Sequence, residues 1–424
     1  MSSYKIRKTP GDTEWFRHDR FGMFIHFGLY SMPARHEWIK YRECMTDEQY
    51  DKYFKYFNPD MFCPREWAKQ AKAAGMKYVV FTTKHHEGFC LWDTKYTDYN
   101  IMNTSYGKDL LHELVDAFRA EGIRIGLYYS LIDWHHPDFT IDIKHPRRKD
   151  ANAKELNQGR DMTKYAAYMR NQITELLTGY GKIDILWFDF SYDSEGLPEN
   201  PWLGGKHKED WEAEKLIATA RSIQPDIIID NRTEVEQDLW TPEQALVNEW
   251  VKDDDGNLVP WEACHTFSGS WGYYRDEVSW KTPNQLIDLL VRCVANGGNL
   301  IMNVGPTSRG YIDDRACKAL AVYADWMKYN SRSIYGCTMA EPEILEKCPA
   351  NCLLTQSEDG KRLYVHLQNY PFNWLRIENL GSRVDYVQFL DDGSEIPFYD
   401  DHNTAVLRPK KECKDYQVIE IFLK

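Results

Sequence analysis

Five of the six short apolar runs along this chain end in side chains of the kind used for catalysis or sugar recognition. These side chains are His26, His85 with His86, Tyr128 with Tyr129, Asp189 and Arg232. Enzymes built on parallel strands place their reactive groups at the carboxyl ends of the strands. One such residue would mean little, but five in the same structural context favour an active site.

Asp189 is the sharpest candidate, because it ends the apolar run Ile183–Phe190. Burial of an unpaired carboxylate there costs several kcal/mol, which favours a nucleophile or base over a simple ion pair with Arg232. Glycosidases need two carboxyl groups, one to attack or activate water and one to protonate the leaving oxygen. Glu243 and Glu262 are both candidates for the second group, and spacing alone does not separate them.

Two histidine-containing segments, His85-His86 and Asp133–Asp138, raise the possibility of a metal site. Neighbouring residues on a strand point to opposite faces, so His85 and His86 are expected to chelate poorly. The sequence has no HExxH motif, and its ten cysteines include no CxxC pair. We therefore expect no metal and no cofactor. A metal-dependent hydrolase and a sugar-binding protein without catalysis remain the alternatives.

Composition limits the partners. The 424 residues carry 52 Lys and Arg against 65 Asp and Glu, a net charge of −13, which argues against nucleic acid or an anionic membrane. No apolar run approaches the roughly 20 residues of a membrane span. The N-terminus lacks the apolar region of a signal peptide, so we expect a cytoplasmic protein with reduced thiols. Aromatic residues make up 14% of the chain, which suits either sugar stacking or an aromatic core.

The candidate residues need a scaffold, and alternating apolar runs and helical patterns predict one. The runs are Phe21–Gly28, Lys77–Lys84, Arg124–Ser130, Ile183–Phe190, Asp226–Arg232 and Asn299–Val304. The helical patterns are Arg65–Ala74, Leu110–Glu121, Tyr165–Tyr180, Trp211–Ile223 and Pro283–Ala295. Such alternation predicts a parallel sheet, and its length favours a (β/α)₈-like TIM barrel over residues 1–336 with two further strands in the insertions.

The tail differs. Residues 337–424 carry strand-like runs that include Leu363–Leu367, Val384–Leu390, Ala405–Leu407 and Gln417–Leu423. A turn at Ser357–Gly360 precedes the first of these runs. This pattern predicts a small antiparallel β-sandwich, which we expect to brace the barrel rather than to bind sugar.

Several segments resemble, in order, the retaining α-L-fucosidases of glycoside hydrolase family 29. They are Trp15-Phe16 and Phe21–Gly28, Thr83–Phe89, Trp187-Phe188-Asp189, Asn231-Arg232, Ser270–Tyr273 and Gly297–Pro306. The resemblance implies the barrel and β-sandwich, and hydrolysis of terminal α-L-fucosides through a covalent glycosyl-enzyme. A glycosidase of related specificity, such as one for α-L-galactosides, is the mildest alternative.

The resemblance also implies roles for individual residues. Asp189 matches the nucleophile, and Glu243 matches the acid/base position of one branch, with Glu262 as the reserve choice. Positions that hold the sugar are matched by His26, Glu37, Trp38, His85, His86, Tyr128, Trp187 and Arg232. We expect Trp38, Trp187 or Phe27 to seat the C6 methyl group. The expected partner is a fucosylated oligosaccharide or glycoconjugate, and a homo-oligomer is possible.

Overall fold

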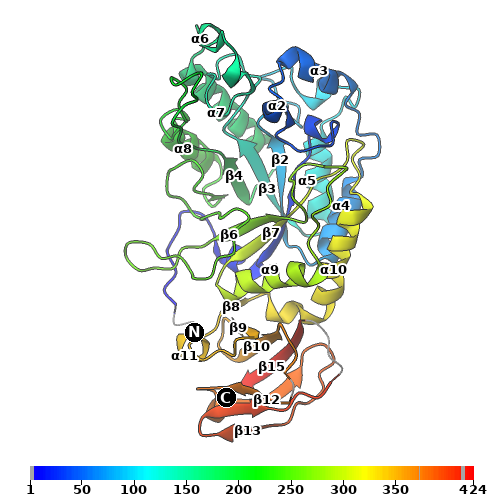
Figure 1. Cartoon of the computed structure of the whole chain (residues 1–424), viewed down its shortest axis with the longest axis vertical. Helices are drawn as coiled ribbons and strands as arrows, with labels where there is room; N and C mark the ends of the chain where they lie inside the picture. Colours follow the sequence, from blue (N-terminus) through cyan, green and yellow to red (C-terminus); the bar gives the residue numbers. More distant parts are fainter. Residues whose placement is uncertain (1–3, 372, 412–415) are drawn as a thin grey trace.

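The computed structural model describes residues 4–371, 373–411 and 416–424. Its centre is a curled parallel sheet of seven strands in the order β5-β4-β3-β2-β1-β7-β6 (Figure 1). The strands are β1 (Phe21–Ile25), β2 (Tyr78–Lys84), β3 (Arg124–Ser130), β4 (Ile185–Asp189), β5 (Ile228–Ile229), β6 (Glu262–Thr266) and β7 (Asn299–Val304). The six runs expected as strands all contribute to it, which confirms the barrel-type fold.

The ring closes through residues 239–244, between β5 and β6. Isolated parallel bridges join Asp230 to Leu239 on one side and join Trp240 to Trp261 and Glu243 to Cys264 on the other. Pro242 explains why this segment is not a regular strand: proline has no N–H, so one rung of the ladder cannot form. The two strands expected in the insertions are therefore β6 and this irregular segment.

Strand β5 is shorter than the expected Asp226–Arg232, because a side chain occupies its free edge. The Asp238 carboxylate accepts the N–H of Ile229 at 2.7 Å and that of Gly11 at 2.8 Å, and Arg221 pairs with it at 2.6 Å. Asp238 is fully buried. Its carboxylate thus takes the place of a strand partner.

Helices pack around the outside of the barrel, and the expected helical segments are all present. The α-helices are α1 (Glu14–Asp19), α2 (Ile39–Arg42), α3 (Asp47–Tyr56), α4 (Pro64–Ala73), α5 (Leu110–Ala120), α6 (Ala153–Leu156), α7 (Met162–Gly179), α8 (Ala213–Ile223), α9 (Pro283–Ala295), α10 (Asp314–Asn330) and α11 (Pro342–Leu345). Short 3₁₀ turns are η1 (Leu29–Ser31), η2 (Ile101–Asn103), η3 (Pro146–Lys149), η4 (Ser331–Ser333) and η5 (Gly381–Arg383). The amphipathic pattern of α5 buries Leu111, Leu114 and Phe118 against the sheet.

Two antiparallel sheets follow the barrel and lie at its lower end in Figure 1. One has the order β12-β15-β10-β9-β8 and the other β11-β14-β13. Their strands are β8 (Cys337–Met339), β9 (Cys352–Ser357), β10 (Arg362–Leu367), β11 (Leu375–Ile377), β12 (Val384–Phe389), β13 (Phe398–Asp401), β14 (Thr404–Leu407) and β15 (Gln417–Leu423). Leu375, Leu407 and Ile421 from both sheets share one apolar core, as the expected β-sandwich requires.

The nine described cysteines are free thiols, and Cys413 lies outside the described residues. Among the described helices, none has the length and apolar character of a membrane span. The cytoplasmic location and the homo-oligomer expected from the sequence stay predictions.

Candidate active site

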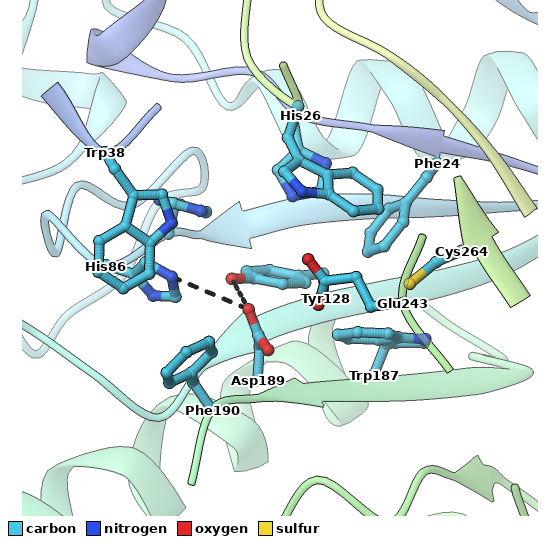
Figure 2. A pocket seen from close by; sticks show the side chains of 12 residues that line it. Phe24, His26, Trp38, His86, Tyr128, Trp187, Asp189, Phe190, Glu243 and Cys264 are labelled. Atoms are coloured by element: carbon cyan, nitrogen blue, oxygen red, sulfur yellow. Dashed lines mark hydrogen bonds and ion pairs between the residues drawn. The ribbon is translucent and has the colours of Figure 1, made fainter. Parts of the chain in front are cut away.

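A pocket opens at the carboxyl ends of the barrel strands (Figure 2). It is lined by Phe24, His26, Trp38, His85, His86, Tyr128, Trp187, Asp189, Phe190, Glu243, Cys264 and Trp271. Eight of the eleven residues expected at the site are in this lining. Arg232 contacts the pocket carboxylates from one side, whereas Glu37 and Glu262 lie outside the lining.

Asp189 is the last residue of β4, and its side chain is only 12% exposed. Its Oδ2 accepts a hydrogen bond from the Tyr128 hydroxyl at 2.8 Å, and Nε2 of His86 lies 3.9 Å from the same oxygen. Burial raises the pKa of the Asp189 carboxyl to about 6, although Arg232 and the Tyr128 hydrogen bond act in the opposite direction. The group is therefore mostly ionised at pH 7, as a nucleophile must be.

Arg232 joins Asp189 to a second carboxylate. Its Nη1 donates to Asp189 Oδ1 at 3.1 Å and to Glu243 Oε2 at 3.0 Å. The two oxygens are therefore no more than about 6 Å apart, which fits the separation of about 5–5.5 Å in retaining glycosidases better than the ~6.5–9.5 Å of inverting ones. The alternative to a catalytic role for Asp189 was a simple ion pair with Arg232. This ion pair is present, but it lies at the pocket and includes a second carboxylate.

The segment 239–244 fixes the position of Glu243. The N–H of Cys264 donates to Pro242 O at 3.1 Å, and the N–H of Gln244 donates to Cys264 O at 3.0 Å. Thr241 accepts a hydrogen bond from Arg232 Nε at 3.0 Å through its hydroxyl. The same short stretch therefore holds both Glu243 and the guanidinium group, while the Glu243 side chain remains 41% exposed.

Two histidines of the pocket have tautomers set by their partners. Asn303 donates its amide N–H to Trp271 O, which leaves Asn303 Oδ1 to accept from His26 Nδ1 at 2.7 Å. Ser130 donates to Ile132 O, so its oxygen accepts from His86 Nδ1 at 2.6 Å. Both Nδ1 atoms carry the proton, and both Nε2 atoms are acceptors. Burial holds the pKa of each ring well below its usual value, so both are neutral.

The histidine pair does not follow the expectation of opposite faces. Strand β2 ends at Lys84, and the rings of His85 and His86 both line the pocket with centroids 4.0 Å apart. The strand rule does not apply because both residues lie in the turn after the strand. No cluster of three His, Cys, Asp or Glu side chains that could hold a metal occurs in the described part of the chain.

Glu37 precedes the pocket residue Trp38 but does not line the pocket itself. Its Oε2 accepts the Gly272 N–H at 2.9 Å and the Ser270 hydroxyl at 3.3 Å. Burial raises the pKa of the Glu37 carboxyl to about 7. Its Oε1 lies 3.1 Å from Nδ1 of His36, so the carboxyl group contacts both His36 and the loop after β6.

Glu262 lies at the opposite end of the barrel interior, at the first position of β6. It is fully buried and accepts a hydrogen bond from the Tyr78 hydroxyl. Burial raises the pKa of Glu262 to about 8. The structure thus places Glu262 beneath the pocket floor and Glu243 at its opening.

The strand alternation explains which aromatic residues reach the pocket. Tyr128 lines it, whereas the Tyr129 hydroxyl donates to Gln172 Oε1 at 2.7 Å on the helical side of the sheet. The expectation for Phe27 is wrong, because its ring packs against Phe57 and Trp67 outside the pocket.

Sequence reasoning assigned no role to four of the lining residues, which are Phe24, Phe190, Cys264 and Trp271. Period-two alternation could have found Phe24, which lies two residues before His26. Trp271 belongs to the segment Ser270–Tyr273, which carried the family resemblance without a role of its own.

Comparisons with known proteins agree with this geometry. A family model described as alpha-L-fucosidase matches residues 2–332. The plasma alpha-L-fucosidase of Homo sapiens is 31% identical over 364 residues, which cover 78% of this chain and 70% of the relative.

Two solved structures extend the comparison. Alpha-L-fucosidase isoenzyme 1 from Paenibacillus thiaminolyticus has a TM-score of 0.89 and 41% identity, covering 97% of this chain and 98% of that one. A family 29 alpha-L-fucosidase from Bacteroides thetaiotaomicron, described as a covalent intermediate trapped with 2-fluoro-fucosyl fluoride, has a TM-score of 0.82 and 28% identity, covering 100% and 98%.

Proposed function

The chain belongs to the alpha-L-fucosidase family of glycoside hydrolases, and on that premise we propose how its own residues hydrolyse a terminal α-L-fucoside with retention of configuration. Asp189 is the nucleophile and Glu243 is the acid/base. One observation carries this assignment: a single guanidinium nitrogen of Arg232 contacts both carboxylates, at 3.1 and 3.0 Å. Carboxyl oxygens no more than about 6 Å apart fit the separation of a retaining enzyme better than that of an inverting one.

In the first step, an Asp189 oxygen attacks the anomeric carbon and the bond to the leaving oxygen breaks. Glu243 donates its proton to that oxygen, and the sugar becomes an ester of Asp189. In the second step, Glu243 removes a proton from water, the water oxygen bonds to the anomeric carbon, and Asp189 leaves as a carboxylate. Esterification removes the Asp189 charge, which favours the change of Glu243 from acid to base.

The contrast in exposure supports Glu243 over Glu262. An acid/base must reach the leaving oxygen and then a water molecule, and the Glu243 side chain is 41% exposed beside the nucleophile. Glu262 is fully buried with Tyr78. A proton on Glu262 has no short route to the leaving group.

The lining of the pocket suits a deoxy sugar. The neutral histidines offer hydrogen bonds to ring hydroxyls without the desolvation cost of a charge. Trp38, Phe190 and Trp271 supply apolar surface for the C–H faces and the C6 methyl group. A hydroxymethyl group, as in an α-L-galactoside, would bring a hydroxyl against this apolar surface, so we expect weaker turnover of that substrate.

The activity is tested with a panel of p-nitrophenyl glycosides, and the first anomer released is identified by NMR. We expect turnover of the α-L-fucoside with α-L-fucose as the first product. Weaker cleavage of the α-L-galactoside would agree with the apolar lining. Inactivity on every member of the panel, or loss of activity on chelation, would contradict the proposal.

A further inference from the structure

His85 differs from the other two pocket histidines in the partner of its Nδ1 atom. That atom lies 3.3 Å from Oε2 of Glu87, and neither atom has a hydrogen-bond partner elsewhere in the described structure. The side chains are 3% and 1% exposed. Burial lowers the pKa of the His85 ring to about 3, so the ring is neutral. A neutral imidazole and a carboxyl group buried face to face share a proton in one of two ways, and the choice decides whether Nε2 presents a donor or an acceptor to the pocket.

We propose that Glu87 is a positioning residue: its carboxyl group fixes the tautomer of His85, and thereby makes His85 Nε2 a hydrogen-bond donor to the sugar. A neutral carboxyl group donates its O–H to Nδ1, which leaves the single imidazole proton on Nε2. An ionised carboxylate instead accepts Nδ1–H, and Nε2 becomes an acceptor.

The surroundings of Glu87 favour the neutral carboxyl group. The charged and titratable groups that face it are Lys40 from α2, Lys84 from β2, Tyr128 from β3, Asp133 from the loop after β3, Tyr30, Tyr50 and Tyr99. Both lysines are paired with other carboxylates, Lys40 with Asp47 at 2.7 Å and Lys84 with Asp133 at 3.1 Å. No uncompensated cation is therefore left for Glu87, and burial raises its pKa to about 8.

The consequence is a mixed set of hydrogen-bonding groups. His26 and His86 present Nε2 as acceptors, as their partners Asn303 and Ser130 require. His85 presents a donor between them, with its ring centroid 5.7 Å from that of His26 and 4.0 Å from that of His86. One sugar hydroxyl can then accept from His85 while it donates to a neighbouring histidine. This part of the inference rests on the proposed function.

The tautomer is measured directly in the free enzyme by two-bond ¹H–¹⁵N correlation of histidine side chains, with His85 assigned by the loss of its signals in His85→Gln. We expect the Nε2–H pattern at pH 7 and the Nδ1–H pattern at pH 9.5. The Nδ1–H pattern at pH 7 would overturn the proposal. This measurement needs no substrate, so it separates the tautomer from the question of turnover.

The Glu87→Gln variant supplies the second test. Its amide donates to Nδ1 at every pH, so His85 should keep the Nε2–H pattern at pH 7 and 9.5. Binding of L-fucose, which carries no charge, is measured in parallel by calorimetry. Loss of one hydrogen bond should weaken fucose binding by about five- to tenfold between pH 7 and pH 9.5 in the wild type, and this loss should be absent in Glu87→Gln.

Glu66→Gln, at an exposed position of α4, is the matched control and should behave as the wild type. Glu37 also titrates in this pH range, in the wild type and in both variants. The effect of Glu87 is therefore read from the difference in pH dependence between the proteins. An equal pH dependence in the wild type and Glu87→Gln would overturn the proposal. If Glu87→Gln does not fold, the wild-type tautomers at the two pH values still decide the matter.

Discussion

Arg232 controls the charge of the reaction centre from a position beside both carboxylates. Its guanidinium lies over the Trp187 ring at 4.7 Å and is fixed by Thr241, so it has little freedom to move away. It stabilises the ionised form of Asp189, which burial disfavours. The nucleophile thus keeps its charge in a site that excludes most water.

Replacement of Arg232 by alanine should therefore raise the pKa of Asp189 above about 6. The acidic limb of the kcat/KM profile, which reports the free nucleophile, should move to higher pH by about 1–3 units, the range for an opposite charge at this distance. Tyr128→Phe removes a hydrogen bond that acts in the same direction, and should cause a smaller shift of the same sign. A limb that stays in place in Arg232→Ala would show that another group controls it.

The two candidate acids are separated by azide rescue. In Glu243→Ala, an activated aryl fucoside should still form the glycosyl-enzyme, and azide should restore turnover by taking the place of water without a general base. Glu262→Ala should show no such rescue, because Glu262 contacts Tyr78 rather than the reaction centre. Rescue confined to Glu262→Ala would reverse the assignment.

Among the elements, the irregular segment between β5 and β6 links stability to catalysis. It closes the barrel and carries Glu243, and it begins beside Asp238, whose buried carboxylate satisfies Ile229, Gly11 and Arg221. Asp238→Ala should lower the free energy of unfolding by about 2–4 kcal/mol, because it leaves buried donors without an acceptor. Urea unfolding measures this loss.

Asp226→Ala is the matched control, since Asp226 precedes the same strand and is exposed. We expect its unfolding free energy to stay within about 0.5 kcal/mol of the wild type, as for most surface substitutions. Equal effects of the two substitutions would contradict the role given to Asp238.

The regular elements could be predicted from the sequence because their signals are local. Continuous apolar runs mark β2, β3 and β7, and three- to four-residue spacing marks α5 and α9. The early end of β5 could not be predicted, because it depends on the side chain of Asp238, and no strand pattern shows that this carboxylate turns back to the N–H of Ile229. The irregular closing strand was missed because Pro242 removes the regular pattern.

The residues of the candidate site could be predicted from the sequence about as far as the elements of the fold. Residues at strand ends, such as His26, Asp189 and Arg232, follow from the fold. The side that His85 and His86 face depends on where β2 stops, which a pattern fixes only to within a few residues. Cys264 gave no signal, because a buried thiol in an apolar setting is more often part of the core.

For the whole molecule, buried acids give stability an unusual dependence on pH. Burial raises the pKa of Glu37 to about 7 and those of Glu87 and Glu262 to about 8. The folded state then binds protons that the unfolded chain has already lost, so stability falls as pH rises through 7 to 8. Buried histidines with lowered pKa values act in the opposite direction, but only below their ordinary pKa of about 6.5.

We therefore expect the urea midpoint of unfolding to fall between pH 6.5 and pH 8.5. In Glu262→Gln, which keeps an acceptor for Tyr78 but cannot ionise, this fall should be smaller. If the two proteins lose stability equally over this range, Glu262 is not held protonated in the fold.

The covalent role of Asp189 is tested most directly by trapping. The enzyme is incubated with 2-fluoro-fucosyl fluoride, whose electronegative substituent slows breakdown of the glycosyl-enzyme, and the labelled peptide is mapped by mass spectrometry. The account predicts one fluorofucosyl group, attached to Asp189 and absent in Asp189→Asn. A label on any other residue, or no label in an enzyme that turns over fucosides, would contradict it.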